Sequence, residues 1–156
     1  MKSRLRYREP KLFLGKFSRT LDTENRFSVP SGFREQLTSG AYLTQGFDRN
    51  LQVLTTGAFQ RVYHTVMNLN LANPLARLLL RLILGTAHEI TINEKGELII
   101  PTELGQFADL RADILVIGQG EYFEIWSPDL WKEQEIKVRD AEVNSSRFSA
   151  LTVTAQ

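Results

Sequence analysis

The sequence predicts a mixed α and β fold built from two copies of one structural unit. Residues 21–30, LDTENRFSVP, align with residues 92–101, INEKGELIIP, at a spacing of 71. The alignment resumes at a spacing of 72 with three further pairs, Leu51/Phe123, Val53/Ile125 and Phe59/Trp131. Both copies read as strand, turn, strand, short helix, strand, turn, strand and long helix. Self-similarity at a fixed period indicates a duplicated architecture.

Length and composition favour two halves that share one core. With 156 residues, each copy has about 70 and would be marginally stable alone. Short hairpins with exposed edges need a partner, and duplication supplies one within the chain. The absence of cysteine excludes disulfides and thiolate metal sites. The apolar run Leu78–Leu84 is too short to span a bilayer, so we expect a cytoplasmic protein with no membrane partner.

Each element of the first copy follows from local signals. Residues 1–11 carry five basic side chains and a proline, which predicts a flexible basic arm. Leu12–Arg19 is predicted as a strand and Asp22–Asn25 as a tight turn. Phe27–Val29 returns as a strand that Pro30 ends. A short helix and a second hairpin follow, at Ser31–Leu37, Ala41–Thr44, Gly46–Asn50 and Leu51–Leu54.

Two helices link the copies. The first runs from about Gly57 to Asn68, with Thr55 or Thr56 as its N-cap. The second begins with Asn73 as N-cap and Pro74 at the first helical position, and Gly85 lies just past its end. Its interior, LARLLLRLIL, is apolar on almost every face. Such a helix must be buried on several sides, which predicts an oligomer or inter-lobe interface.

The second copy repeats the scheme and sets the domain boundaries. Its elements are a hairpin at 88–100, a short helix near 102–108, strands at 113–117 and 122–126, and a helix from Ser127-Pro128 to about Lys137. From Val138 onward the chain is polar and unpatterned, which predicts a mobile tail. The predicted organisation is an arm at 1–11, a domain at 12–58, linking helices at 59–86, a domain at 87–130, and a C-terminal helix and flexible tail at 131–156.

Charge is distributed unevenly between the halves. Residues 1–60 carry 10 Lys and Arg against 5 Asp and Glu, whereas residues 91–156 carry 6 against 12. This asymmetry favours a first half that meets a polyanion such as DNA and a second half that does not.

Asp22 and Arg26 are the strongest candidates for a binding site. They lie four residues apart across a turn, so the carboxylate can orient the guanidinium. The remaining guanidinium donors then suit phosphate oxygens or guanine in the major groove, which is wide enough for a two-stranded ribbon. Lys16 and Arg19 extend Arg26 into a predicted basic strip, and we expect Asn25 to contact a phosphate or base edge. The competing interpretation is a hairpin salt bridge with a purely structural role.

The run LFLGKFSRTLDTENRFSVPSGFREQL closely resembles the opening of the MraZ family of bacterial transcriptional regulators. Its D-x-x-x-R, S-[VI]-P and R-E-x-L patterns occur in the same order, and the resemblance extends over about 12–135 through GTAHEI, Ile100-Pro101 and Glu124–Trp126. The family's D-x-x-x-R falls on Asp22 and Arg26. In the second copy the corresponding residues are Asn93, as the orienting residue, and Glu97. Glu97 would repel phosphate, and Lys95 offers the only compensation.

The resemblance implies a fold and a function. The fold is α+β, with tandem SpoVT/AbrB-like domains packed as a swapped-hairpin β-barrel with flanking helices. Such proteins assemble into rings, here an octamer or larger. They bind direct repeats in double-stranded DNA upstream of a division and cell-wall gene cluster, which includes their own gene, and they repress it. The implied location is the nucleoid.

Two other classes of function remain open from the sequence. An oligomeric protein-interaction module of the same fold would explain the loss of the second motif. A hydrolytic enzyme has least support, because His64 and His88 are isolated and no nucleophile motif or metal-ligand spacing occurs. We therefore expect no catalytic residue, metal, cofactor or small-molecule substrate.

Overall fold

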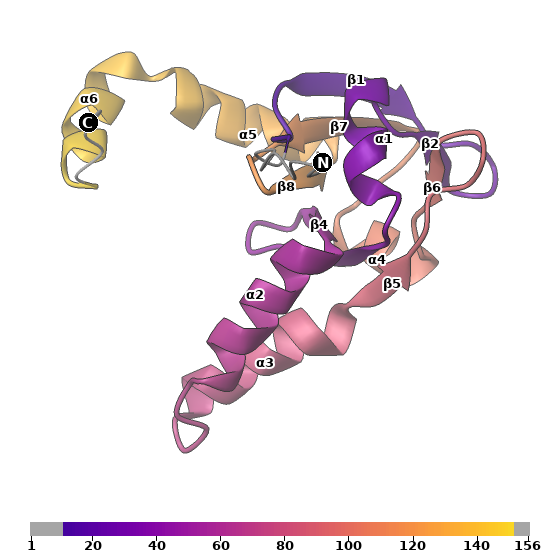
Figure 1. The fold of residues 1–156 in the computed structure, drawn as a ribbon. Coiled ribbons are helices and arrows are strands. Elements are labelled where there is room, and N and C mark those ends of the chain that lie inside the picture. Colours follow the sequence, from indigo (N-terminus) through magenta and orange to yellow (C-terminus); the bar gives the residue numbers. More distant parts are fainter. Residues whose placement is uncertain (1–10, 152–156) are drawn as a thin grey trace, which may run out of the picture.

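The computed structural model describes residues 11–151, and an antiparallel six-stranded sheet forms the centre of this region (Figure 1). A separate two-stranded ribbon lies at one end of the sheet. The sheet order is β1-β7-β8-β4-β3-β5, and the ribbon pairs β2 with β6. The strand bounds are β1 Lys16–Thr20, β2 Arg26–Ser28, β3 Ala41–Gln45, β4 Leu51–Thr55, β5 His88–Ile90, β6 Glu97–Ile99, β7 Asp113–Gly118 and β8 Tyr122–Trp126.

The two halves exchange their first hairpins. β1 pairs with β7 of the second half, and β5 pairs with β3 of the first half. β2 and β6 pair with each other across the halves. The strands on either side of each tight turn therefore belong to different sheets and do not pair with each other. The predicted pairing between the two copies is what the structure has instead.

The sheet is open, which corrects the closed barrel implied by the family resemblance. β1 and β5 are its two edges, and within residues 11–151 they do not pair with each other. The ribbon extends neither edge, because β2 and β6 pair with each other. β1 is also shorter than the predicted Leu12–Arg19 strand, because Gly15 at φ +98° interrupts it.

One core serves both halves. Equivalent positions of the two copies are buried together, as in the pairs Phe27/Leu98 and Val29/Ile100. Phe13 lies between the halves, with its ring centroid 5.0 Å from that of Phe33 and 5.2 Å from that of Phe123. Each half thus completes the other's apolar surface, as their small size requires.

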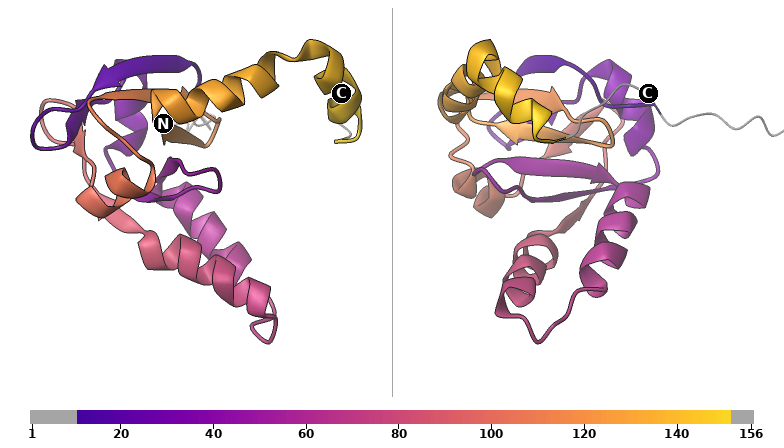
Figure 2. Two further views of the ribbon diagram at one scale, coloured as in Figure 1. Left: turned by 180° about the vertical axis from the view of Figure 1, so that it is seen from behind. Right: turned by 90° about the vertical axis from the view of Figure 1, so that its left-hand side faces the viewer.

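The linking helices form a hairpin that projects from the sheet (Figures 1 and 2). α2 spans Thr56–Met67, and the Thr55 hydroxyl accepts a hydrogen bond from the N–H of Ala58 at 3.1 Å. α3 spans Pro74–Thr86, and the Asn73 side chain accepts from the N–H of Leu75 at 2.9 Å. Gly85 lies within the last turn of α3 rather than past its end. The base of the hairpin packs on β3 and β4.

Two shorter helices follow the ribbon strands, and two more form the C-terminal arm. α1 spans Ser31–Leu37 and α4 spans Thr102–Phe107, each after a proline. α5, Pro128–Arg139, begins at Ser127, whose hydroxyl accepts from the N–H of Leu130. α6, Ala141–Ser149, corrects the unpatterned tail expected there. The Asp140 carboxylate caps α6 by accepting from the N–H of Val143 at 3.2 Å.

The arm extends away from the sheet, and α6 contacts α5 (Figure 2). Residues 1–10 of the predicted N-terminal basic arm lie outside the described residues, and so do residues 152–156 of the predicted C-terminal tail. Between residues 11 and 151, no helix combines the length and apolar character needed to cross a bilayer.

Candidate nucleic-acid interface

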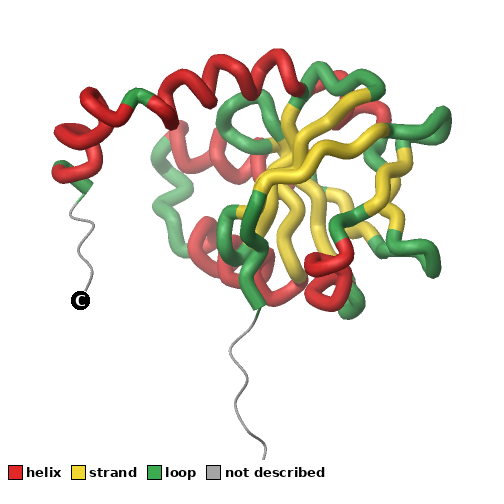
Figure 3. Tube along the Cα trace, turned by 90° about the horizontal axis from the view of Figure 1, so that it is seen from above, coloured by secondary structure: helices red, strands yellow, loops and turns green. Residues whose placement is uncertain are grey.

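The β2–β6 ribbon presents two tight turns at one end of the molecule. Phe27 and Leu98 face each other in the ribbon and are buried against the core. Because strand side chains alternate, their neighbours face outward. These outward residues are Arg26, Ser28, Glu97 and Ile99. The turns, at Asp22–Asn25 and Asn93–Gly96, project at that same end of the molecule, on either side of the ribbon (Figures 1 and 3).

The first turn holds Arg26 in a fixed position. One oxygen of the Asp22 carboxylate accepts from the N–H groups of Glu24 at 2.8 Å and Arg26 at 2.9 Å. The other accepts from Arg26 Nε at 3.0 Å, and Glu24 lies 3.3 Å from Arg26 Nη2. The backbone hydrogen bond from Arg26 lowers the pKa of Asp22, and the hydrogen bond to Asp22 raises the pKa of Arg26. The guanidinium is therefore oriented before any ligand arrives.

Asn25 serves the turn through its backbone. It adopts φ +61°, a left-handed conformation that asparagine tolerates better than most residues. Its carbonyl accepts from the N–H of Ile100 at 2.9 Å and so joins the turn to the end of β6. The residue predicted to contact DNA thus has a conformational role at this position.

The second turn has the same backbone hydrogen bonds as the first. Only the hydrogen bond between its two side chains runs in the opposite direction, from the first residue to the residue four positions later. The Asn93 side-chain oxygen accepts from the N–H groups of Lys95 at 3.0 Å and Glu97 at 2.9 Å. The Asn93 amide then donates to the Glu97 carboxylate at 3.0 Å. Gly96, at φ +78°, occupies the position of Asn25. Asn93 thus contacts both the backbone and the side chain of residue 97, and that side chain is an anion.

The predicted basic strip is only partly assembled. Arg19 donates from Nε to the Ser28 carbonyl at 2.9 Å, which places it beside the ribbon and ties β1 to β2. Lys16 lies at the other end of β1, where its ammonium is 5.9 Å from the ring centroid of Trp131. Residues three apart on a strand face opposite sides, so Lys16 and Arg19 diverge. Arg19 and Arg26 lie at the ribbon, and Lys16 does not.

Sequence reasoning missed Arg34, a residue of α1. Its Nε donates to the Val29 carbonyl at 2.9 Å, and its Nη2 donates to the Ser28 hydroxyl at 3.2 Å. Its guanidinium also lies against Gly96 in the second turn. Comparing the two copies position by position could have identified it. The spacing of 71 aligns Arg34 with Gly105, so this cation occurs in the first copy and not in the second.

No group of three or more histidine and carboxylate side chains lies at metal-binding distance within residues 11–151. Cationic side chains and carboxylates gather together at the two turns, and Arg26 and Arg34 each keep guanidinium donors that the hydrogen bonds and ion pairs of residues 11–151 do not use.

Comparisons with known proteins show which proteins this chain resembles. A family model described as "MraZ protein, putative antitoxin-like" matches residues 12–82 and again residues 83–152. The chain is 32% identical over 138 residues to a protein from Roseiflexus castenholzii, covering 88% of this chain and 94% of that one. It is 31% identical over 142 residues to one from Clostridium acetobutylicum, covering 91% and 100%. Both relatives are named transcriptional regulator MraZ.

Proposed function

The chain belongs to the MraZ family, and from that premise we propose that it is a transcriptional regulator that binds double-stranded DNA through the β2–β6 ribbon. The observation that carries the proposal is the oriented guanidinium of Arg26 on the outward face of the ribbon. Asp22 and Glu24 engage two of its five N–H donors, which leaves the others for phosphate oxygens or the acceptors of guanine. A two-stranded ribbon is narrow enough to enter the major groove.

Binding through one ribbon would be weak, so we propose that several copies bind together. A ring of an octamer or larger, facing direct repeats in the DNA, would raise the affinity through effective concentration. The surface that supports self-association is the apolar side of the α2–α3 hairpin, where Leu75 is 70% and Leu78 is 58% exposed.

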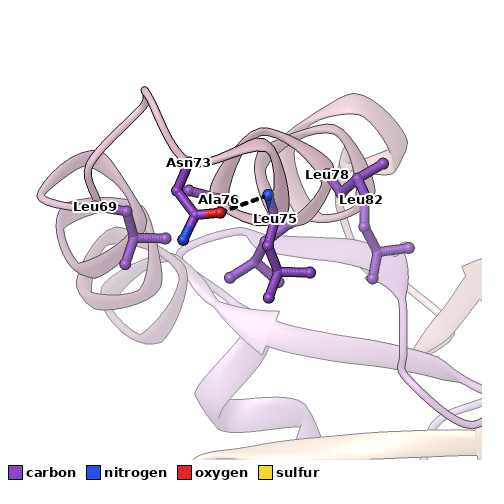
Figure 4. A pocket seen from close by; sticks show the side chains of 7 residues that line it. Leu69, Asn73, Leu75, Ala76, Leu78 and Leu82 are labelled. Atoms are coloured by element: carbon purple, nitrogen blue, oxygen red, sulfur yellow. Dashed lines mark hydrogen bonds between the residues drawn. The ribbon is translucent and has the colours of Figure 1, made fainter.

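A groove of about 480 Å³ lies on this hairpin (Figure 4). It is lined by Leu69, Asn73, Leu75, Ala76, Leu78, Leu79 and Leu82. Monomers seldom leave such a contiguous leucine surface in water. We assign the groove to contact with a second copy of this chain, in agreement with the interface predicted from the helix composition.

The proposed target is the DNA upstream of the protein's own division and cell-wall gene cluster, and the proposed outcome is repression. The proposed site of action is accordingly the nucleoid, in the cytoplasm. These points rest on the family resemblance. Neither a catalytic step nor a cofactor has a part in this function.

The test is binding of the full chain to its own upstream DNA, measured by fluorescence anisotropy at two salt concentrations with scrambled DNA alongside. Arg26→Ala should lose at least roughly tenfold in affinity, because it removes charge-assisted hydrogen bonds. Arg61→Ala is the matched control, since Arg61 is exposed on α2 and pairs with Glu121.

A second candidate function is favoured by Glu97, which places an anion where the first turn has a cation. On this alternative the protein is an oligomeric interaction module that has weakened or lost DNA binding. Equal, weak binding of wild type and Arg26→Ala to both DNAs would support the module and refute the regulator.

A further inference from the structure

The internal repeat relates each turn of the ribbon to one helix. The spacing of 71 carries Asn25 onto Gly96 and Arg34 onto Gly105. α1 begins after Pro30, and α4 begins after the equivalent Pro101. Because the halves exchange hairpins, α1 approaches the second turn and α4 approaches the first. The two turns therefore have corresponding helices beside them, and the facing position is Arg34 in α1 and Gly105 in α4.

Beside the first turn, α4 has Gly105 at the position where α1 has Arg34, so no side chain extends from it toward the turn. A hollow of about 110 Å³ lies there, lined in part by Asn25, Ile100 and Gly105. A Cβ added at Gly105 would meet only Ile100 Cγ2, at 3.8 Å, which is an ordinary contact. No side chain of α4 reaches across to the turn from this position.

Beside the second turn, Arg34 occupies the corresponding space. Two hydrogen bonds, to the Val29 carbonyl at 2.9 Å and to the Ser28 hydroxyl at 3.2 Å, hold its guanidinium. The group covers Gly96 so closely that a Cβ there would overlap its Nε, Cζ and Nη1 atoms. Gly96 is consequently buried, although the turn itself is exposed. Within residues 11–151, no carboxylate lies within 4.0 Å of Arg34.

The charges at the two turns balance in the same way. The first has two carboxylates, Asp22 and Glu24, with Arg19 and Arg26. The second has two carboxylates and two cations as well: Glu94, Glu97, Lys95 and Arg34. Glu97 accepts from the Asn93 amide at 3.0 Å and, like the other carboxylates within residues 11–151, forms no ion pair with Arg34. The loss of arginine at position 97 is thus offset by an arginine supplied from another element.

We propose that the second turn is also a DNA-phosphate-binding site, in which Arg34 and Lys95 take the place of the arginine that the second copy lacks. This inference rests on the proposed function, because the ligand is the same duplex DNA. It gives the ribbon a cationic contact at each end. Arg34 has five N–H donors and uses two of them within the protein, which leaves three for phosphate oxygens.

The test uses the full chain and its own upstream DNA, with anisotropy titrations over a series of salt concentrations. Arg34→Met keeps an unbranched, flexible side chain and removes the guanidinium with its charge. We expect it to weaken binding roughly tenfold. The slope of log affinity against log salt should fall by about 1, equally for upstream and scrambled DNA. Lys95→Met, in an exposed turn, should lower the slope by a similar amount.

Controls separate binding from support of the fold. Ser28→Ala removes one hydrogen bond of Arg34 and no charge, so the salt slope, which reports cationic contacts, should stay unchanged whatever happens to the affinity. Arg34→Lys should retain most of the slope, which a purely structural role would not explain. Arg61→Met controls for the loss of an exposed arginine elsewhere. If Arg34→Met does not fold, as judged by circular dichroism, Lys95→Met and Arg34→Lys decide the question.

Two outcomes would overturn the inference, and they are distinguishable. Wild-type affinity and salt slope in Arg34→Met and Lys95→Met, with Arg26→Ala still impaired, would refute the second site and leave the proposed function intact. Failure of wild type to prefer its upstream DNA, with no effect of Arg26→Ala, would refute the proposed function and this inference together.

Discussion

The two turns of the ribbon have the same backbone and opposite outward charge. In each, a side-chain oxygen at the first position accepts two backbone N–H groups, from Glu24 and Arg26 in one case and from Lys95 and Glu97 in the other. Asp and Asn both supply that oxygen. The turn therefore depends on the acceptor, whereas the residue four positions later is free to change from arginine to glutamate. The second copy has lost the D-x-x-x-R motif and has kept the turn that presents it.

Substituting the left-handed residue of each turn, Gly96 or Asn25, should show the largest difference in stability between the turns. Gly96→Ala is expected to destabilise the fold by about 2 kcal/mol or more, because alanine is strained at φ +78° and displaces Arg34 from two hydrogen bonds. Asn25→Gly should be nearly neutral, since glycine adopts φ +61° freely and no side chain covers that turn in the same way. Urea denaturation measures both, and equal destabilisation would contradict the difference between the turns.

Restoring the motif in the second turn should remove the functional difference. The double variant Asn93→Asp with Glu97→Arg recreates D-x-x-x-R on a turn that already has the required hydrogen bonds. We expect affinity for upstream DNA to rise by roughly tenfold, because a repulsive carboxylate becomes a charge-assisted donor. The salt slope should steepen by about 1 for the added arginine.

Unchanged anisotropy titrations in a folded double variant would show that the second turn does not meet DNA. Asn93→Asp alone is the matched control, since it keeps the turn and adds no cation.

The smallest expected difference between the turns is in how the melting temperature of the protein changes in acid. The pKa of Asp22 is lowered, first by the backbone hydrogen bond from Arg26, below its ordinary value of 3.8. Its contribution to stability is therefore complete above pH 3.8 and is lost as the pH falls through the lowered value. Asp22→Asn should have a flatter melting-temperature profile than wild type in this acidic range. The second turn already has asparagine, so Asn93→Gln, the control, should lower the melting temperature at every pH and leave the shape of its acid dependence unchanged.

Local features of the fold were predictable from the sequence, and long-range ones were less so. The N-caps at Asn73 and Ser127 were predicted correctly, and Thr55 was one of two candidates for α2, because a cap depends on residues a few positions apart. The duplication also predicted that strands of one copy would pair with the other. The open sheet was missed, because whether two distant edges meet is not encoded in local spacing. α6 was missed because its residues show no clear apolar period.

The candidate site was predicted in part for the same reason. The Asp22–Arg26 pair was predictable from a four-residue spacing. Arg34 was not, because its contact with Gly96 exists only after two halves of the chain have exchanged hairpins. Lys16 was misplaced for the opposite reason: closeness in sequence to Arg19 did not bring it to the ribbon.

The exchange of hairpins also sets the order in which the chain can fold during its synthesis. Lys16 pairs with Ile117, so β1 leaves the ribosome about 100 residues before its partner does. At about 5–20 residues per second, the first strand waits on the order of ten seconds with an unpaired edge. The first copy cannot complete its sheet in that time, and neither half is expected to fold when expressed alone. Duplication has therefore made the two copies one folding unit, which translation must finish before the ribbon exists.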